Sequence, residues 1–456
     1  MPAYFAKRAL LPQGWAENVR LDVDQQGILI AVTSGESAEG CIVLQGAVVP
    51  GMPNLHSHAF QRLMAGLAEV AGDPQDSFWT WRDLMYRLVQ RLTPPQVGVI
   101  ARQLYIEMLK GGYTQVAEFH YLHHQADGQP YQDRGEMTAH ISHAAQQAGI
   151  GLTMLPVLYS YSGFGSQPAL AGQKRFIQDS DSYLLQQQII AGQIAASPLQ
   201  NQGLCFHSLR AVNLQQIEQV LSASSANLPV HIHIAEQQKE VSDSLAWCGE
   251  RPVGWLLNHV DVDARWCLVH ATHLDDSERD RLAASGAVAG LCPTTEANLG
   301  DGIFPAVEYI AQQGRWGIGS DSHVSLNVVE ELRWLEYTQR LRDRRRNRMV
   351  TAQQPAVGEV LYRQALAGGA QACGAQIGSL RVGYRADWLV LDGNDPYLAA
   401  ASTDQLLNRW LFAGGPQQIK DVYVAGKAVI VAGQHAQQQD AANDFFQLLK
   451  TLQETF

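Results

Sequence analysis

The chain is built from short apolar runs whose pattern changes twice along its length. Near the start, "NVRLDVD", "ILIAVTSG" and "GCIVLQGAVVPG" alternate apolar and polar positions, as half-buried β-strands do. The same pattern returns late, in "GSLRVGYRADWLVLDG" and "IKDVYVAGKAVI". Each end is too short to bury a core alone. We therefore expect both ends to meet in one small β-sandwich domain, residues 1–48 and 376–456, which ends in an amphipathic C-terminal helix.

Between these ends the pattern changes to an alternation of strands and helices. Eight apolar runs are typical of buried strands: "MPNLHSH", "YTQVAEFH", "GLTMLPVL", "GLCFHSL", "PVHIHIAE", "RWCLVHA", "AVAGLCP" and "RWGIGSD". Helical patterns lie between most of them, and one has Thr93 as its N-cap and Gly111 and Gly112 at its end. Eight strands, each followed by a helix or long loop, predict an α/β fold with a TIM-like (β/α)8 barrel over residues 49–375.

Composition narrows the classes of protein that fit. The chain has 456 residues and a net charge of -11, and 46% of its residues are hydrophobic and 17% charged, as in a soluble globular enzyme. The acidic balance argues against a nucleic-acid partner. No apolar signal core opens the chain, no run is long enough to span a bilayer, and the six cysteines show no CxxC spacing. We expect a cytoplasmic protein with no membrane partner.

Histidines and acids recur where these strands end. His56 and His58 are two residues apart, so their side chains face the same way in a strand. His231 and His233 repeat this geometry; His233 lies nearer the barrel rim and is the expected ligand, with His231 packed deeper. Asp321 follows "GIGS", whose glycines let the backbone crowd the barrel end. Three imidazoles and a carboxylate make a site for a zinc-like ion.

Two further strand-end residues are available for proton transfer. Glu236 follows His233 by three residues, and His270 closes "RWCLVH". Together with a metal site they indicate metal-assisted hydrolysis. The alternatives are a salt-bridged loop carboxylate for Glu236 and a buried structural histidine for His270. His273 lies past the strand end and favours a structural role.

The order of these motifs resembles the amidohydrolase superfamily, particularly its mononuclear deaminase and chlorohydrolase branch. The likeness includes "VVPGMPNLHSH" and "GSLRVGYRADWLVLD". It implies that Asp321 and His270 orient and deprotonate a water molecule and that Glu236 carries a proton to the substrate nitrogen. The fourth strand holds His207 where binuclear members hold a lysine, which implies one metal ion per subunit. That ion is expected to be Zn²⁺, with Fe²⁺ or another divalent ion left open, and the enzyme is expected to be a homodimer.

The loops after the strands supply candidate pocket residues. The polar candidates are Gln61, Arg82, Tyr121, His207 and Arg210, and the loop "DSFWTWRDLMYR" adds Trp79 and Trp81. Arginine grips a carboxylate with two parallel N–H bonds, so these residues favour a small amino-acid-derived substrate. Structural ion pairs and loop packing are the alternative roles of the arginines and tryptophans. The sequence leaves two possibilities for this loop, closure over the substrate as a lid and a fixed position.

Longer stretches resemble the formiminoglutamate deiminases of bacterial histidine degradation: "HSHAFQRLMAGL", "DSFWTWRDLMYRL", "VAEFHYLHH" and "CFHSLRAV". This resemblance implies hydrolysis of N-formimino-L-glutamate to N-formyl-L-glutamate and ammonia. Two alternatives stay open: a superfamily deaminase acting on guanine, cytosine or S-adenosylhomocysteine, and an inactive barrel that serves as a scaffold. An oxidoreductase is disfavoured because no GxGxxG follows a strand.

Overall fold

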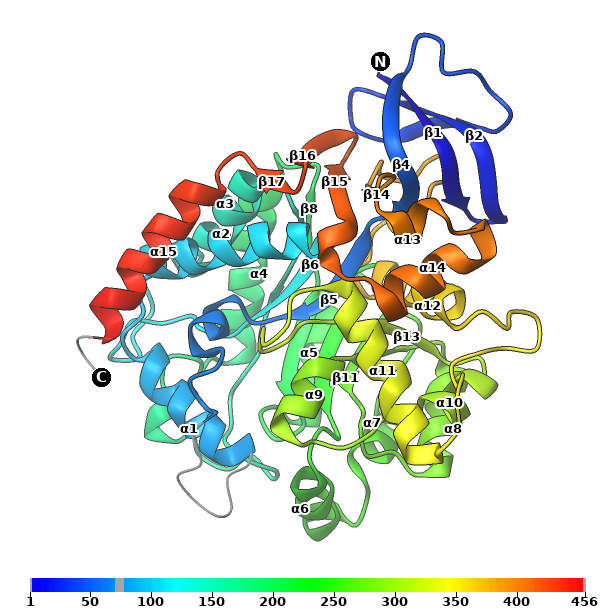
Figure 1. The fold of residues 1–456 in the computed structure, drawn as a ribbon. Coiled ribbons are helices and arrows are strands. Elements are labelled where there is room, and N and C mark those ends of the chain that lie inside the picture. Colours follow the sequence, from blue (N-terminus) through cyan, green and yellow to red (C-terminus); the bar gives the residue numbers. More distant parts are fainter. Residues whose placement is uncertain (1, 70–77, 454–456) are drawn as a thin grey trace.

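A closed barrel of eight parallel strands forms the centre of the molecule (Figure 1). The computed structural model describes residues 2–69 and 78–453. The barrel strands are β5 (Met52–Ser57), β6 (Tyr113–His120), β7 (Gly151–Pro156), β9 (Leu204–Ser208), β10 (Val230–Ile234), β11 (Trp266–His270), β12 (Val288–Leu291) and β13 (Arg315–Ile318). Each lies within one of the eight apolar runs, so the barrel prediction is confirmed. A short strand that the pattern did not predict, β8 (Gln200–Gln202), pairs with β7.

Two short backbone bridges close the barrel. Strands β5 to β7 form one parallel sheet with β8, and strands β9 to β13 form another. The sheets meet where Leu158 pairs with Phe206 and where Ser57 pairs with Asp321. At the second seam the N–H of Asp321 donates to the carbonyl of His56 at 3.0 Å. The first and last strands of the barrel are therefore joined directly at candidate metal ligands.

Helices cover the outside of the barrel (Figure 1). Helix α2 shows why the sequence signals are reliable here: Thr93 is its N-cap, the Thr93 N–H donates to the Gln96 side chain at 3.0 Å, and Gly111 ends it. Between the first two barrel strands lie η1 (Ala59–Met64), α1 (Phe78–Val89) and α2 (Pro94–Lys110). The later helices are α3 (Glu136–Ala148), α4 (Ser180–Ile194), α5 (Leu214–Ala223), α6 (Gln238–Cys248), α7 (Pro252–His259), α8 (Asp276–Ser285), α9 (Pro293–Leu299), α10 (Ala306–Ala311), α11 (Val328–Asp343) and α12 (Val357–Ala372). A short turn, η2 (Ala171–Gln173), precedes α4.

Both ends of the chain build one eight-stranded sheet beside the barrel. Its strands are β1 (Ala3–Leu11), β2 (Gly14–Val23), β3 (Leu29–Thr33), β4 (Ile42–Pro50), β14 (Trp388–Asp392), β15 (Ile419–Val424), β16 (Lys427–Val431) and β17 (Gln434–His435). The two ends join where β4 pairs antiparallel with β14. The sheet folds back on itself: the Tyr4 hydroxyl donates to the Gly426 carbonyl at 2.6 Å, and Trp388 lies in a core that the two halves share. The predicted β-sandwich of both ends is confirmed.

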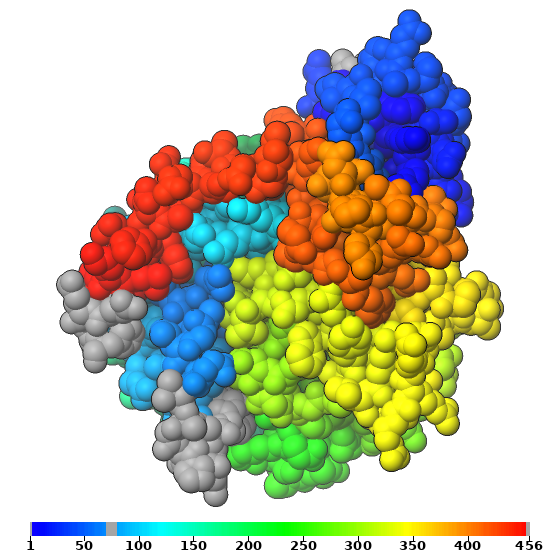
Figure 2. Space-filling model, in the orientation of Figure 1, coloured from blue at the N-terminus to red at the C-terminus, as the bar shows by residue number. Residues whose placement is uncertain are grey.

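The remaining C-terminal elements pack on the barrel. They are α13 (Pro396–Ala399), α14 (Thr403–Ala413), η3 (Pro416–Gln418) and α15 (Gln438–Gln453). Helix α15, the predicted amphipathic helix, lies against α2 (Figures 1 and 2). It buries Leu448 and Leu452, while Phe446 is exposed. All six cysteines carry free thiols. Among the described residues, none of the helices combines the length and the apolar character that a bilayer crossing needs. The domain boundaries at residues 48 and 375 stay a prediction.

Candidate metal centre and active site

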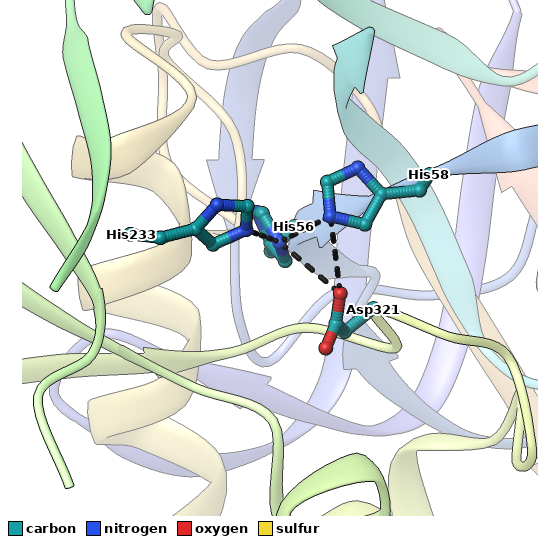
Figure 3. Close-up of side chains that lie close together, drawn as sticks. All are labelled: His56, His58, His233 and Asp321. Atoms are coloured by element: carbon teal, nitrogen blue, oxygen red, sulfur yellow. Dashed lines mark hydrogen bonds and ion pairs between the residues drawn. The ribbon is translucent and has the colours of Figure 1, made fainter. Parts of the chain in front are cut away.

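Four predicted side chains converge at the end of the barrel (Figure 3). The Nε2 atom of His56 lies 3.1 Å from that of His58 and 2.9 Å from that of His233. One carboxylate oxygen of Asp321 lies 3.3 Å from the His56 nitrogen and 3.2 Å from the His58 nitrogen. Ligands bound tetrahedrally to Zn²⁺ at its usual bond lengths are about 3.3 Å apart. The four donor atoms therefore have the spacing of ligands round a single ion.

The hydrogen bonds behind these rings leave the ligand nitrogens free to bind a cation. The Nδ1–H of His58 donates to the Phe119 carbonyl at 2.7 Å, and that of His233 donates to the His207 carbonyl at 3.1 Å. A ring that is protonated at Nδ1 presents a lone pair at Nε2. Burial lowers the pKa of His56 to about 3, which keeps that ring neutral. Buried lone pairs at this distance repel one another, and a cation between them removes the repulsion.

A close approach of two backbones positions the first and last ligands. Gly319 precedes Asp321 and lies so near His56 that a Cβ atom on it would be 2.9 Å from the His56 backbone nitrogen. The crowding of the barrel end that the "GIGS" glycines predicted is present. Asp321 itself has a φ of 42°, so the chain turns sharply at the ligand. Although burial raises the pKa of Asp321, the contacts with His56 and His58 hold it well below its usual range.

A buried carboxylate fixes the turn that carries His58. One oxygen of Glu118 accepts the N–H of Ala59 at 2.6 Å, and the other accepts the Ser57 hydroxyl at 2.6 Å and the Tyr105 hydroxyl at 3.1 Å. Glu118 is fully buried, and burial raises its pKa to about 7. Its three donors lie on both sides of His58 and on α2, so it ties the ligand turn to the surrounding helix layer. The sequence pattern did not single it out.

The proposed proton-transfer residues lie beside the metal ligands. The Nε2 atom of His270 is 3.7 Å from Glu236 and 3.9 Å from Asp321. Its Nδ1 atom is 3.3 Å from Glu296, a residue of α9. Burial alone would lower the pKa of His270. The carboxylates, with Glu236 contributing most, outweigh this effect and raise the pKa to about 10. Burial also raises the pKa of Glu236 to about 7, a value that suits a proton donor near neutral pH.

Sequence reasoning missed Glu296 and a second acid, Asp301. Asp301 is 5% exposed, and its carboxylate lies within 4.8 Å of Glu236 and His270. Both acids follow β12 in a helix and a loop, where "PTTEANLGDG" gives no strand-end signal. The Nε2–H of His231 donates to the Ala372 carbonyl, and the Nε2–H of His273 donates to the Asp301 carbonyl, both at 2.8 Å, so neither ring joins the metal ligands.

A cavity opens from the metal ligands, and the predicted pocket residues line it. Its lining combines the site with polar and aromatic side chains: His58, Gln61, Trp81, Arg82, Met85, Tyr86, Tyr121, Tyr159, Ser162, Phe176, His207, Ser208, Arg210, His233, Glu236, His270, Leu299 and Asp321. The Gln61 amide donates to the Tyr121 hydroxyl at 2.9 Å, and its own oxygen is buried without a hydrogen bond. The structure thus brings Gln61, Arg82, Tyr121, His207 and Arg210 together. Tyr86 and Tyr159 were not predicted. The side chain of Trp79 lies outside the described residues.

The two cavity arginines are held by neighbours on different elements. The guanidinium of Arg82 lies 5.3 Å from the centre of the Tyr86 ring in α1. The guanidinium of Arg210 lies 3.9 Å from Glu240 in α6. Burial and the nearby charge of Arg210, followed by His58 and Arg82, keep the pKa of His207 well below its usual value. A cavity with two guanidinium groups and a neutral imidazole attracts anions.

The fold and this site define a class: the chain belongs to the amidohydrolase family, whose sequence profile matches residues 47–429. The four-ligand cluster is the metal site of this metal-dependent family. A second profile, described as the N-terminal domain of the formimidoylglutamate deiminase HutF, matches residues 1–41.

One relative resembles the chain over its whole length. The formimidoylglutamate deiminase of Pseudomonas aeruginosa is 64% identical over 452 residues, which cover 99% of this chain and 100% of that protein. A 5-methylthioadenosine/S-adenosylhomocysteine deaminase of Thermodesulfovibrio yellowstonii is 26% identical, over 85% of this chain and 81% of that one. The crystal structure of an amidohydrolase from Brucella melitensis superposes with a TM-score of 0.95 at 44% identity, over 99% of this chain and 100% of that chain.

Proposed function

We propose that this enzyme hydrolyses N-formimino-L-glutamate to N-formyl-L-glutamate and ammonia, a reaction of histidine degradation. The observation that carries the proposal is one cavity that is lined both by metal ligands and by two arginines. The substrate has matching groups: an amidine-like head for the metal centre and its acids, and two carboxylates for the arginines. The 64% identity to a formimidoylglutamate deiminase supports the same reaction.

The metal ion would be held by His56, His58, His233 and Asp321, and when bound it would lower the pKa of a water molecule. We propose Zn²⁺, because three neutral imidazoles and one carboxylate are ligands that suit it. Homodimer formation and a cytoplasmic location remain predictions from the sequence.

The remaining residues of the site would move protons and hold the substrate. Asp321 and His270 would orient the water and take its proton, and the positive charge of a cation at the four ligands favours the neutral imidazole that this needs. Glu236 would give a proton to the terminal nitrogen, and the C–N bond then breaks to release ammonia. Attack by water adds the oxygen that becomes the formyl group, so the reaction is a balanced hydrolysis.

The cavity walls would set the substrate class. Arg82 and Arg210 would bind the two carboxylates, with Gln61, Tyr121 and His207 as neutral polar contacts. The buried oxygen of Gln61 has no hydrogen bond in the protein, so it is available to a substrate N–H. The pocket therefore favours a dicarboxylate over a neutral nucleobase.

Ammonia release from a panel of compounds tests this proposal. N-formimino-L-glutamate should be hydrolysed far faster than N-formiminoglycine, guanine, cytosine or S-adenosylhomocysteine. Arg210→Met should raise the KM for the dicarboxylate by about 100-fold, since a charged hydrogen bond contributes about 1.5–3 kcal/mol. Arg345→Met, at an exposed position, is the matched control. Faster turnover of a nucleobase, or an unchanged KM in Arg210→Met, would reject the assigned substrate or its orientation.

A further inference from the structure

A group of buried acids lies beside the metal centre. Four carboxylates surround one imidazole, that of His270: Glu296 at 3.3 Å, Glu236 at 3.7 Å, Asp321 at 3.9 Å and Asp301 within 4.8 Å. Asp321 belongs to the metal ligands, and Glu296 accepts the N–H of Cys292 at 2.9 Å. The remaining two acids are Glu236, whose neighbouring positive groups are His270 and Arg210, and Asp301, which has His270 beside it.

Hydrogen bonds hold the backbone of Asp301, while one oxygen of its side chain has no partner. Its backbone N–H donates to the Glu296 carbonyl at 2.9 Å, and its own carbonyl faces the His273 ring at 2.8 Å. One carboxylate oxygen accepts from the Gln237 amide, while the other is buried without any hydrogen-bond partner. A buried carboxylate oxygen without a hydrogen-bond partner destabilises the folded protein, because its lost hydration is not replaced. Burial first, and then Glu236, raise the pKa of Asp301 to about 9.

We propose that Glu236, His270 and Asp301 form a second divalent-cation site, separate from the four-ligand metal centre, and that a cation bound there inhibits the enzyme. The three side chains offer one ligand atom each, all within 4.8 Å of one another. Two carboxylates and one imidazole suit Zn²⁺ and similar divalent ions. Tetrahedral ligands are about 3.3 Å apart, so the side chains would close by up to about 1.5 Å round the ion.

Inhibition follows from the place of the site in the cavity. Glu236 and His270 line the substrate cavity, whereas Asp301 does not. A cation would therefore enter from the cavity and occupy both side chains proposed for proton transfer. Substrate and inhibitory cation would compete, so excess metal should raise KM and leave kcat unchanged. This competition rests on the proposed function, but the binding of a second cation does not.

Metal stoichiometry is the direct test. Holoenzyme with one equivalent of Zn²⁺ is dialysed against rising Zn²⁺, and the metal per chain is measured without substrate. Wild type should take up a second equivalent, and Asp301→Asn should bind that equivalent about tenfold more weakly while it keeps the first. Asp276→Asn, whose side chain is 91% exposed, is the matched control and should behave as wild type.

Several outcomes would reject the second site. One equivalent per wild-type chain throughout the titration is one, and an undiminished second equivalent in Asp301→Asn is another. Should Asp301→Asn not fold, Asp301→Glu serves, since it keeps the charge but displaces the oxygens by one methylene and should also weaken the second equivalent. Inhibition by Zn²⁺ is then measured at several substrate concentrations. A second equivalent with an unchanged KM would reject the inhibitory role alone.

Discussion

The carboxylate of Glu240 contacts both Arg210 and the backbone turn that precedes Glu236. One of its oxygens lies 3.9 Å from the Arg210 guanidinium, and the other accepts the backbone N–H of Ala235 at 3.2 Å. Ala235 has a φ of 50° and immediately precedes Glu236. Glu240 is 1% exposed, so this contact lies inside the protein and sets the position of both neighbours.

Replacing Glu240 by glutamine should therefore impair substrate binding. The amide keeps the acceptor for Ala235 but loses the charge facing Arg210, so KM for the dicarboxylate should rise about tenfold, equivalent to about 1.4 kcal/mol. Steady-state kinetics and metal content measure this, with the exposed Glu218→Gln as control. A lower KM would mean that Glu240 competes with the substrate for Arg210.

Glu236→Gln should separate metal binding from turnover. Glu236 is not one of the four metal ligands, so the variant should keep its metal. A glutamine cannot donate and regain the proton, and general acid catalysis typically contributes about 10²–10⁴-fold, so kcat should fall by about that factor. Metal analysis together with ammonia release provides the measurement. Wild-type kcat in this variant would remove Glu236 from the proposed mechanism.

Gly319→Ala should disturb the metal centre without touching a ligand. The added Cβ would lie 2.7 Å from the Cβ of His56, which is closer than two such atoms can approach. Forcing the strand ends apart should cost about 1–3 kcal/mol in the free energy of unfolding and lower the metal bound per chain. Gly192→Ala is the control, because no atom lies within 4 Å of its Cβ. In α4 it should stabilise by about 0.5–1 kcal/mol. Equal thermal stability and metal content in Gly319→Ala and wild type would contradict the close approach.

The pH dependence of stability should reveal Glu118. Burial raises its pKa from 4.5 to about 7, so in the metal-free protein folding takes up a proton between these values. Stability from this group is then present at low pH and is lost as pH rises from about 5 to 7, by roughly 2 kcal/mol. The glutamine side chain of the Glu118→Gln variant does not titrate in this pH range. Urea unfolding of both metal-free proteins at pH 5 and 7 should show a loss that is larger by this amount in wild type, since the other buried acids and the histidines are present in both proteins.

Much of the fold could be predicted because its signals are local. A barrel strand that is buried on both faces is a short apolar run, and helices such as α2 carry their start and stop residues with them. The HxH spacing places two rings on one face of a strand whatever surrounds it. Strand-end position therefore found His56, His58, His233 and Asp321, which the structure brings together.

The rest of the site depends on contacts between distant segments. Glu118 lies inside β6 in a run that resembles any other buried strand, and its role appears only when Ser57 and Tyr105 are placed beside it. Glu296 and Asp301 come from a helix and a loop whose approach to His270 is fixed by tertiary packing. Tyr159 likewise reaches the cavity from beyond the end of β7. The spacing of apolar residues along the sequence carries no information about such contacts between distant segments.

The seam between β5 and β13 gives the metal centre a built-in order of assembly. Ligands at positions 56 and 321 sit on the two strands that meet last when a barrel made in chain order shuts, and Ser57 pairs with Asp321 at that junction. During synthesis the ion can be fully enclosed only after about 70% of the protein, up to Asp321 of 456 residues, has been translated. Metal binding would then hold the first and last barrel strands together once the barrel has closed. A truncated chain that ends before β13 would carry the three histidine ligands without the aspartate.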